Sequence, residues 1–467
     1  MRKLAAVIGL GVLIAASSCS ATTPPAPAVP VAVPAVREVL TTDRTSPVVH
    51  DNEVMALADH AGRLFAATDQ WEYQGSEAYG QILVKDTAGG PWRIFEQTRS
   101  IRVQALVSFP IPADQGLGPG HSLLVTQAIV DGKSRIQWLL DGAGTFDPAD
   151  SYVLPTGAAV RSFGVHESGR EWAVYAGAEP SGILRGVWSP TRHTLEFSLV
   201  PELTGVAPGS PGLKTRKITA FADCAGALYA TMNTTLYRRI DGVPPRWIPV
   251  FQEGPVGRYN SGLRGLSCVR HDGKPSLLLS AEGSGEVHRF DHLSQGQLTP
   301  VSEFAPVSAI RRMLAARGSV VPASGPGSIG YVIAAYNDIT TVPIDGVNRQ
   351  VFGFEWGYQG ERCAPARACG PTAFGTETFD AAACFAIRTD HGSAPSYSLH
   401  CLTGPDFMSS GQVTDPIRAG QAFVSIRTVR PSPFGDDHLY FGGYDCNFHP
   451  ADGTAWVASA GLRLTSR

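Results

Sequence analysis

The sequence lacks the local motifs by which many enzymes can be recognised. It contains no G-x-S-x-G nucleophile elbow, no H-E-x-x-H zinc motif, no phosphate-binding P-loop and no C-x-x-C pair. It also lacks a basic excess, because its net charge is −3, and this argues against a nucleic-acid partner. Charged residues make up only 17% of the chain, against ~25% in average proteins. Enzymes built from scattered loops and ligand-binding proteins remain as the open classes.

A long apolar run is also missing beyond the first residues, so we expect no membrane-spanning helix in the body of the protein. The N-terminus places Arg2 and Lys3 before an apolar run that ends at Ala16, which is typical of an export signal. Residues Ala16 to Cys19 resemble the lipobox of bacterial lipoproteins, and this resemblance implies acylation of Cys19. The expected location is the cell membrane or the outer membrane. Secretion or a periplasmic location after cleavage near Ala21 is the alternative.

Composition divides the chain into three parts. Residues 1–19 are the expected signal peptide, and residues 20–36 are rich in proline and alanine, which favours an extended tether. Residues 37–467 are the expected folded body. We expect the tether to hold this body away from the membrane, which the protein would contact through the lipid anchor only.

The remaining cysteines predict disulfides, since exported proteins retain them. The economical local pairs are Cys363 with Cys369 and Cys384 with Cys401, and Cys224 with Cys268 would join neighbouring repeats. Cys446 is left over.

An internal repeat is the most informative pattern in the body of the chain. The segment VMALADHAGRLFAATDQW at Val54 corresponds closely to ITAFADCAGALYATMNTTLY at Ile218. Weaker copies start at Val103, Val160, Leu263, Ile310 and Val424. Several short strands in each unit of about 40–50 residues are typical of propeller blades.

These units resemble the bacterial β-propeller superfamily in the broad sense. The resemblance implies an all-β fold with a single propeller of four-stranded blades, with seven blades as the best fit and six or eight as alternatives. We expect the strand that begins at Arg37 to complete the last blade and close the ring. Residues of about 351–415 depart from the repeat, which predicts outer strands of the sixth blade and a Cys-rich insertion.

A basic residue recurs where the innermost strand of successive units begins. The set consists of Arg102, Arg161, Lys217, Arg264 and Arg312. Converging on a channel, such residues would form a funnel that concentrates an anion. The alternative is that each one pairs with a nearby carboxylate or carbonyl between neighbouring sheets.

Two further site hypotheses concern acidic and aromatic residues. Resemblance to lactonase propellers implies that Glu53, Asn337 and Asp445 could hold Ca²⁺ or another divalent cation for hydrolysis. Asp and Asn at these places also serve as ordinary turn formers. Trp71 and Trp356 stand in glycine-flanked polar segments that suit an aromatic platform for sugars or a protein partner.

The sequence therefore predicts a binding or scaffolding propeller for a glycan, peptide or anionic ligand at the cell envelope, without a required cofactor. A metal-assisted, lactonase-like hydrolase is the alternative. No nucleophile motif decides between them.

Overall fold

The fold is known from a computed structural model. It describes Leu40, Asp51, Ser100 and residues 31–38, 53–69, 80–98, 102–155, 158–204, 217–254, 262–316, 320–358, 378–379, 383–392, 394–403, 423–445 and 455–462. Nearly all of these residues lie in short strands and the turns that join them, which confirms the expected all-β class.

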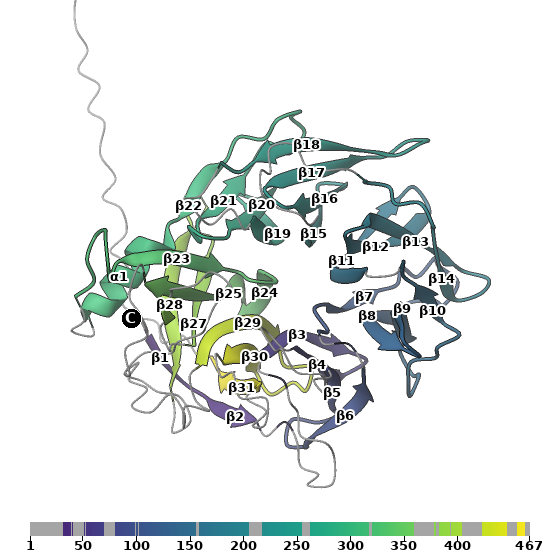
Figure 1. Cartoon of the computed structure of the whole chain (residues 1–467), viewed down its shortest axis with the longest axis horizontal. Coiled ribbons are helices and arrows are strands. Elements are labelled where there is room, and N and C mark those ends of the chain that lie inside the picture. Colours follow the sequence, from purple (N-terminus) through teal and green to yellow (C-terminus); the bar gives the residue numbers. More distant parts are fainter. Residues whose placement is uncertain are drawn as a thin grey trace, which may run out of the picture.

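The strands stand around a common axis as the blades of a β-propeller (Figure 1). Four blades are separate four-stranded sheets, and one larger sheet of seven strands forms another. An eight-stranded sheet holds two more, and among the described residues the strands of these two blades pair with each other at Glu53 and Tyr444. The described strands thus group into seven blades.

The first five blades follow one another along the chain, each as four antiparallel strands. Blade 1 contains β3 (Glu53–His60), β4 (Arg63–Asp69), β5 (Gln81–Lys85) and β6 (Trp92–Gln97). Blade 2 contains β7 (Leu106–Pro110), β8 (Ser122–Val130), β9 (Lys133–Leu140) and β10 (Ser151–Val153). Blade 3 contains β11 (Ala159–Ser168), β12 (Glu171–Glu179), β13 (Gly182–Ser189) and β14 (Thr194–Phe197). Blade 4 contains β15 (Ile218–Cys224), β16 (Ala227–Met232), β17 (Thr235–Ile240) and β18 (Arg246–Gln252). Blade 5 contains β19 (Leu263–His271), β20 (Lys274–Ala281), β21 (Val287–Phe290) and β22 (Val301–Phe304).

The last two blades include strands from both ends of the described chain. Blade 6 contains β23 (Ile329–Ala334), β24 (Thr340–Ile344), β25 (Val347–Tyr358), β26 (Thr378–Phe379), β27 (Cys384–Thr389), β28 (Ser396–Thr403) and β1 (Val31–Pro34). Blade 7 contains β29 (Phe423–Pro431), β30 (His438–Asp445), β31 (Trp456–Gly461) and β2 (Val36–Glu38).

The close repeat between the Val54 and Ile218 units is explained by identical hairpins. In both units the first two strands are joined by an Ala-Gly turn with positive φ at each residue: 50° and 74° at Ala61 and Gly62, and 53° and 75° at Ala225 and Gly226. Such two-residue turns match the twist of antiparallel strands.

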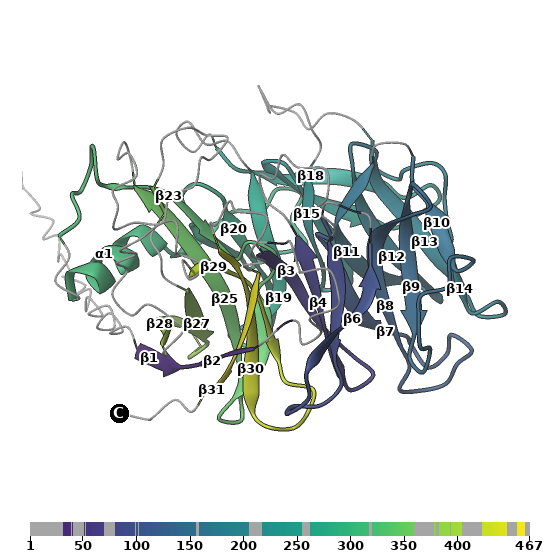
Figure 2. The same cartoon turned by 60° about the horizontal axis from the view of Figure 1, so that its bottom comes forward.

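The ring is closed by the N-terminal strand, as expected. Strand β2 pairs antiparallel with β31 at the outer edge of blade 7. The preceding strand β1 pairs parallel with β28 on blade 6, so the end of the segment expected as a tether is part of the sheet structure. Figures 1 and 2 show β1 and β2 following each other along the outer side of these two blades.

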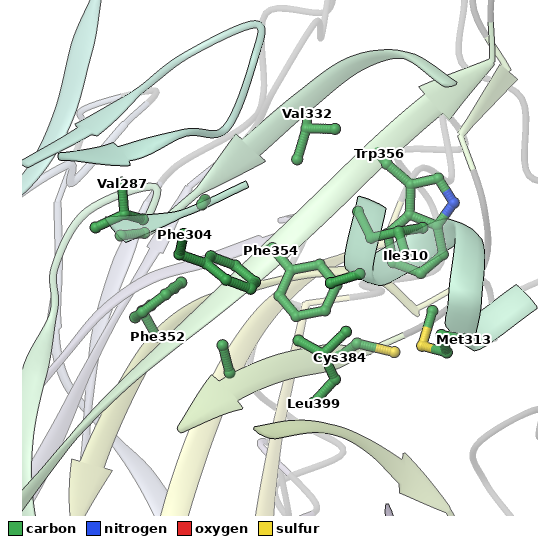
Figure 3. Close-up of a cluster of buried hydrophobic side chains, with 14 of the residues drawn as sticks. Val287, Phe304, Ile310, Met313, Val332, Phe352, Phe354, Trp356, Cys384 and Leu399 are labelled. Carbon is green, nitrogen blue, oxygen red and sulfur yellow. The ribbon is translucent and has the colours of Figure 1, made fainter. Parts of the chain in front are cut away.

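Blade 6 differs from the expected repeat. The segment at Ile310, expected as an inner strand, forms the helix α1 (Pro306–Ala316) instead. Its buried residues Ala309, Ile310, Met313 and Leu314 follow helical spacing. Figure 3 shows Ile310 and Met313 beside Trp356 and Cys384, in one hydrophobic cluster between α1 and the sheet. The inner strand of blade 6 is β23, which starts at Ile329.

Both faces of the blades are buried against their neighbours. The cluster between blades 2 and 3, for example, contains Val125, Trp138, Val174 and Trp188. This arrangement explains why the strand segments are apolar on both faces instead of alternating. In the part of the chain that the structure describes, no helix is long and apolar enough to span a membrane.

Two of the three expected disulfides are present. Cys224–Cys268 joins the inner strands of blades 4 and 5, and Cys384–Cys401 joins neighbouring strands of blade 6. The expected pair Cys363–Cys369, the leftover Cys446 and the expected lipidation site Cys19 lie outside the described residues.

Candidate functional site

The innermost strands of the ring enclose a central cavity of about 260 Å³. Residues of β3, β7, β11, β15, β19 and β29 line it, together with Asn337 and Asp338 from the segment between β23 and β24. Because every blade contributes, this cavity is the propeller channel. We call the end where the inner strands begin the channel mouth.

A repeated ion pair occupies the mouth in blades 3 and 5. The arginine stands near the start of the inner strand, and the carboxylate stands 18 positions later, at the end of the second strand. The pairs are Arg161 with Glu179 and Arg264 with Glu282. Each arginine is therefore neutralised within its own blade.

A larger network occupies the mouth between blades 6, 7 and 1. Arg102 donates to Asp69 at 2.6 Å and to Glu53 at 2.9 Å. Arg427 donates to Glu53 at 3.2 Å and lies 3.1 Å from Glu355. Burial raises the pKa of the Glu355 carboxyl, and Arg427 opposes this shift. This side of the mouth therefore concentrates buried acidic groups.

Two tyrosines connect the two sides of the mouth. The guanidinium carbons of Arg427 and Arg264 lie 3.8 Å and 4.3 Å from the ring centre of Tyr336, within the range of cation–π attraction. Tyr331 donates its hydroxyl to Glu282 at 2.7 Å. Both tyrosines are buried.

Cations and carboxylates occur together in the described part of the mouth. The basic residues are Arg102, Arg161, Lys217, Arg264 and Arg427, and the carboxylates include Glu53, Asp69, Glu179, Glu282 and Glu355. The mouth is thus not a uniformly positive funnel. Its arginines follow the alternative interpretation, in which each one pairs with a nearby carboxylate.

Lys217 departs from this pattern. In the part of the chain that the structure describes, its ammonium group has no hydrogen bond or ion pair. Burial lowers the pKa of Lys217, and the guanidinium groups of Arg161 and Arg264 lower it further. Glu282 and Glu179 offset part of that effect.

The isolation of Lys217 follows from two uncharged residues in blade 4. The backbone NH of Asn233 donates to Lys217, just as that of Glu282 donates to Gly262, so Asn233 stands where blade 5 has its carboxylate. Thr219, two residues after Lys217, stands where blades 3 and 5 have arginine. Asn233 accepts a hydrogen bond from the Lys217 backbone at 3.0 Å and brings no negative charge.

Two of the aromatic and basic candidates lie elsewhere, and a third is outside the described residues. Arg312 is exposed on α1 and not on an inner strand. Trp356 is 0% exposed within β25, so it packs in the core of blade 6 and presents no surface platform. Trp71 lies outside the described residues.

Two of the three expected cation ligands are already engaged by other groups. Both oxygens of Glu53 accept from arginines, and the amide nitrogen of Asn337 donates to the carbonyl of Met55. The side chain of Asp445 lies outside what the structure describes. Among the described residues, no three His, Cys, Asp or Glu side chains cluster as a metal site. The described donors therefore do not fit a divalent cation in this arrangement.

Several mouth residues were not predicted from the sequence, namely Glu179, Glu282, Glu355, Tyr331 and Tyr336. A signal for two of them existed, because a carboxylate follows the arginine after 18 positions in both the Arg161 and the Arg264 units. The role of Tyr336 had no such signal, since it depends on the break between β23 and β24.

Comparison with known proteins gives likenesses of fold only. No family model and no curated protein matches the chain. Among solved structures, an ancestral GH74 enzyme is similar over 93% of this chain, with 12% identity and a TM-score of 0.47. The match covers 52% of that enzyme, so this chain spans about half of its length. The β-propeller domain of Cps50 (Swd1) from Myceliophteria thermophila matches 89% of this chain and 99% of its own, with 10% identity and a TM-score of 0.44. The GH93 α-L-arabinofuranosidase of Fusarium graminearum, solved with arabinobiose, matches 74% and 97%, with 11% identity and a TM-score of 0.38. The function is therefore inferred from this chain's own residues.

Proposed function

We propose that the propeller is a binding module of the cell envelope that holds a carboxylate-bearing ligand at the channel mouth, with Lys217 as the anchoring cation. The carboxylate would come from an acidic glycan or an acidic peptide, and both present the same group to the ammonium. Export and attachment through Cys19 belong to the same proposal, and they rest on the residues before Val31.

The unpaired charge of Lys217 is the observation that supports this function. A partly buried ammonium without a carboxylate is unfavourable, and an anionic ligand would relieve its repulsion by Arg161 and Arg264. The sequence on either side of blade 4 agrees with this role. Segments 205–216 and 255–261 contain no Asp or Glu and carry Lys214, Arg216 and Arg258.

Catalysis has less support than binding. The lactonase-like hydrolase would need Glu53 to exchange two guanidinium partners for a cation. The described mouth offers ion pairs that hold its carboxylates in place, and only Lys217 is left to receive a ligand group. Metal analysis of the purified protein separates the two functions, because a bound stoichiometric cation would favour the hydrolase.

The test compares glucuronate with glucose, since they differ in the carboxylate, and then a galacturonate oligosaccharide with an Asp-rich peptide. We expect calorimetry to show preference for the acidic sugar in the wild-type protein. In Lys217→Met the preference should fall by about 10- to 100-fold, the range of a hydrogen bond to a charged group. The oligosaccharide and the peptide then decide which source of carboxylate is preferred.

Two variants serve as controls. Lys274→Met removes an exposed charge from the first residue of β20, at the other end of the inner strand, and should bind as the wild type does. Lys217→Met itself should keep or raise the thermal midpoint, because it removes a cation whose pKa burial has lowered. Retention of the carboxylate preference by Lys217→Met would exclude the proposed site.

A further inference from the structure

A second pocket opens between blades 2 and 3, on the same end of the propeller as the channel mouth. Its volume is about 510 Å³, within the usual range for a small-molecule site. Its apolar wall consists of Ile129, Val153, Leu154, Pro155, Ala158 and Ala159. Polar side chains of Ser100, Arg102, Gln104, Gln127, Lys133 and Ser134 complete it.

The pocket continues the buried interface of the two blades. Leu123 and Val125 of β8 pack in the hydrophobic cluster between blades 2 and 3. Residues two apart in a strand share a face, so Gln127 takes the next position of that row. Small residues Ala158 and Ala159 stand opposite, where blade 3 begins, and they leave the space that forms the pocket.

Gln127, which lines this pocket, carries an unused acceptor. Its residue is 3% exposed, and its amide nitrogen donates to the hydroxyl of Ser134 at 2.9 Å. That hydroxyl donates to the carbonyl of Ala158 at 3.0 Å, which fixes the orientation of the amide. The carbonyl oxygen of Gln127 has no hydrogen-bond partner among the described residues. A buried acceptor without a donor is costly, so the site is suited to a ligand that supplies one.

We propose that this pocket is a second ligand site, distinct from the Lys217 site, for a small, mostly apolar molecule that carries one N–H or O–H donor. The apolar wall accommodates the body of the ligand, and the donor bonds to the Gln127 oxygen. Lys133 at the pocket disfavours a cationic ligand. Gln104 lines both this pocket and the channel cavity, so the two sites are adjacent.

Indole and benzofuran test the proposal, since these bicyclic probes have nearly the same shape and only indole has an N–H donor. We expect crystals of the full chain soaked with indole to show the ring in this pocket with its nitrogen on the Gln127 oxygen. Titration should give roughly fivefold to tenfold tighter binding of indole than of benzofuran, the ratio that one net hydrogen bond supplies. In Gln127→Met, which keeps the side-chain size and lacks the acceptor, this ratio should fall to about one, and benzofuran should still bind.

A second variant tests the pocket independently of the hydrogen bond. Ala159→Leu fills space from an exposed position on β11 and should weaken both probes equally. Three outcomes would overturn the proposal: indole bound only elsewhere, an unchanged ratio in Gln127→Met, or an ordered water that stays on the Gln127 oxygen under saturating indole.

Discussion

Histidines that lie between blades show how single residues tie this ring together. His166 of blade 3 lies 2.8 Å from Asp223 and 3.2 Å from Asp241, both in or next to blade 4 strands. Burial alone would lower the pKa of His166, but its bonds to these two carboxylates raise it. Between blades 1 and 2, burial and Arg63 instead lower the pKa of His60 to about 4. Lowering the pH therefore favours the folded state through His166 and disfavours it through His60.

The stability that His166 contributes should depend on pH. Its folded pKa lies above the unfolded value of ~6.5, so the stabilisation is complete below that pH and disappears as the pH rises through the folded pKa. We expect His166→Gln to lower the urea midpoint strongly at pH 5.5 and much less at pH 9. A difference between the variant and the wild type that stays constant over this range would contradict the doubly paired, protonated His166.

His60 provides the control of opposite sign. Because its pKa is lowered to about 4, the folded protein loses stability as the pH falls from ~6.5 towards that value. His60→Gln should therefore cost less at pH 5 than at pH 8, the reverse of the trend expected for His166→Gln.

At the scale of elements, strands were predictable wherever local signals and packing agree. The repeat segments at Val54 and Ile218 form the first two strands of blades 1 and 4, and the short apolar runs QILVK and WIPVF that follow them form β5 and part of β18. The expectation of a strand at Ile310 is wrong because the apolar residues of α1 also fit the pattern of the repeat. Yet Ile310, Met313 and Leu314 have helical spacing, and Pro306 suits a first turn.

The candidate site was predictable only in part, for physical reasons. The basic position of each blade follows from the repeat, but its charge partner comes from another strand or blade. Arg102, for instance, pairs with Asp69 and Glu53 of blade 1. The burial of Trp356 could not be predicted for the same reason. Its segment is polar and glycine-flanked in sequence, but β27 and α1 cover it in the fold. Lys217 is unusual because blade 4 has Asn233 and Thr219 where blade 5 has a carboxylate and an arginine.

A matched pair of variants tests whether the segment at Ile310 forms the helix α1 and not an inner strand. Ile310 is 0% exposed in the cluster with Trp356, so Ile310→Ala should lower the free energy of unfolding by about 2–4 kcal/mol. Arg312 is exposed on the same helix, and Arg312→Ala should change stability by less than ~0.5 kcal/mol. It should also leave glucuronate binding unchanged. Loss of glucuronate binding in Arg312→Ala would instead indicate that Arg312 lies at the channel mouth.

At the scale of the whole molecule, the ring is held together by pairing between the ends of the described chain. Strand β2 supplies the outer strand of blade 7, and its Glu38 reaches blade 1 by an ion pair of 2.8 Å with Lys85. The same carboxylate accepts from the hydroxyl of Ser459 at 2.8 Å. One residue thus connects the first and last blades, in addition to the single strand pairing of Glu53 with Tyr444.

This closure predicts the effect of altering Glu38. Lys85 is 3% exposed in its side chain, so Glu38→Gln leaves a buried ammonium whose remaining described partner is the carbonyl of Gly90. We expect a loss of about 2–3 kcal/mol in urea unfolding, below the ~3–5 kcal/mol of a fully buried broken pair, because that carbonyl stays in place.

Truncation tests the same closure at the level of strands. A chain that begins at Val31 keeps every described strand and should unfold at the same urea concentration as the full chain. A chain that begins at Leu40 lacks β1 and β2, which exposes the edges of β28 and β31. Because unpaired edges favour association, this shorter chain should unfold at lower urea concentration and form oligomers in light scattering. Equal stability and a monomeric state for both truncated chains would mean that the ring is held by blade packing alone, without its N-terminal strands.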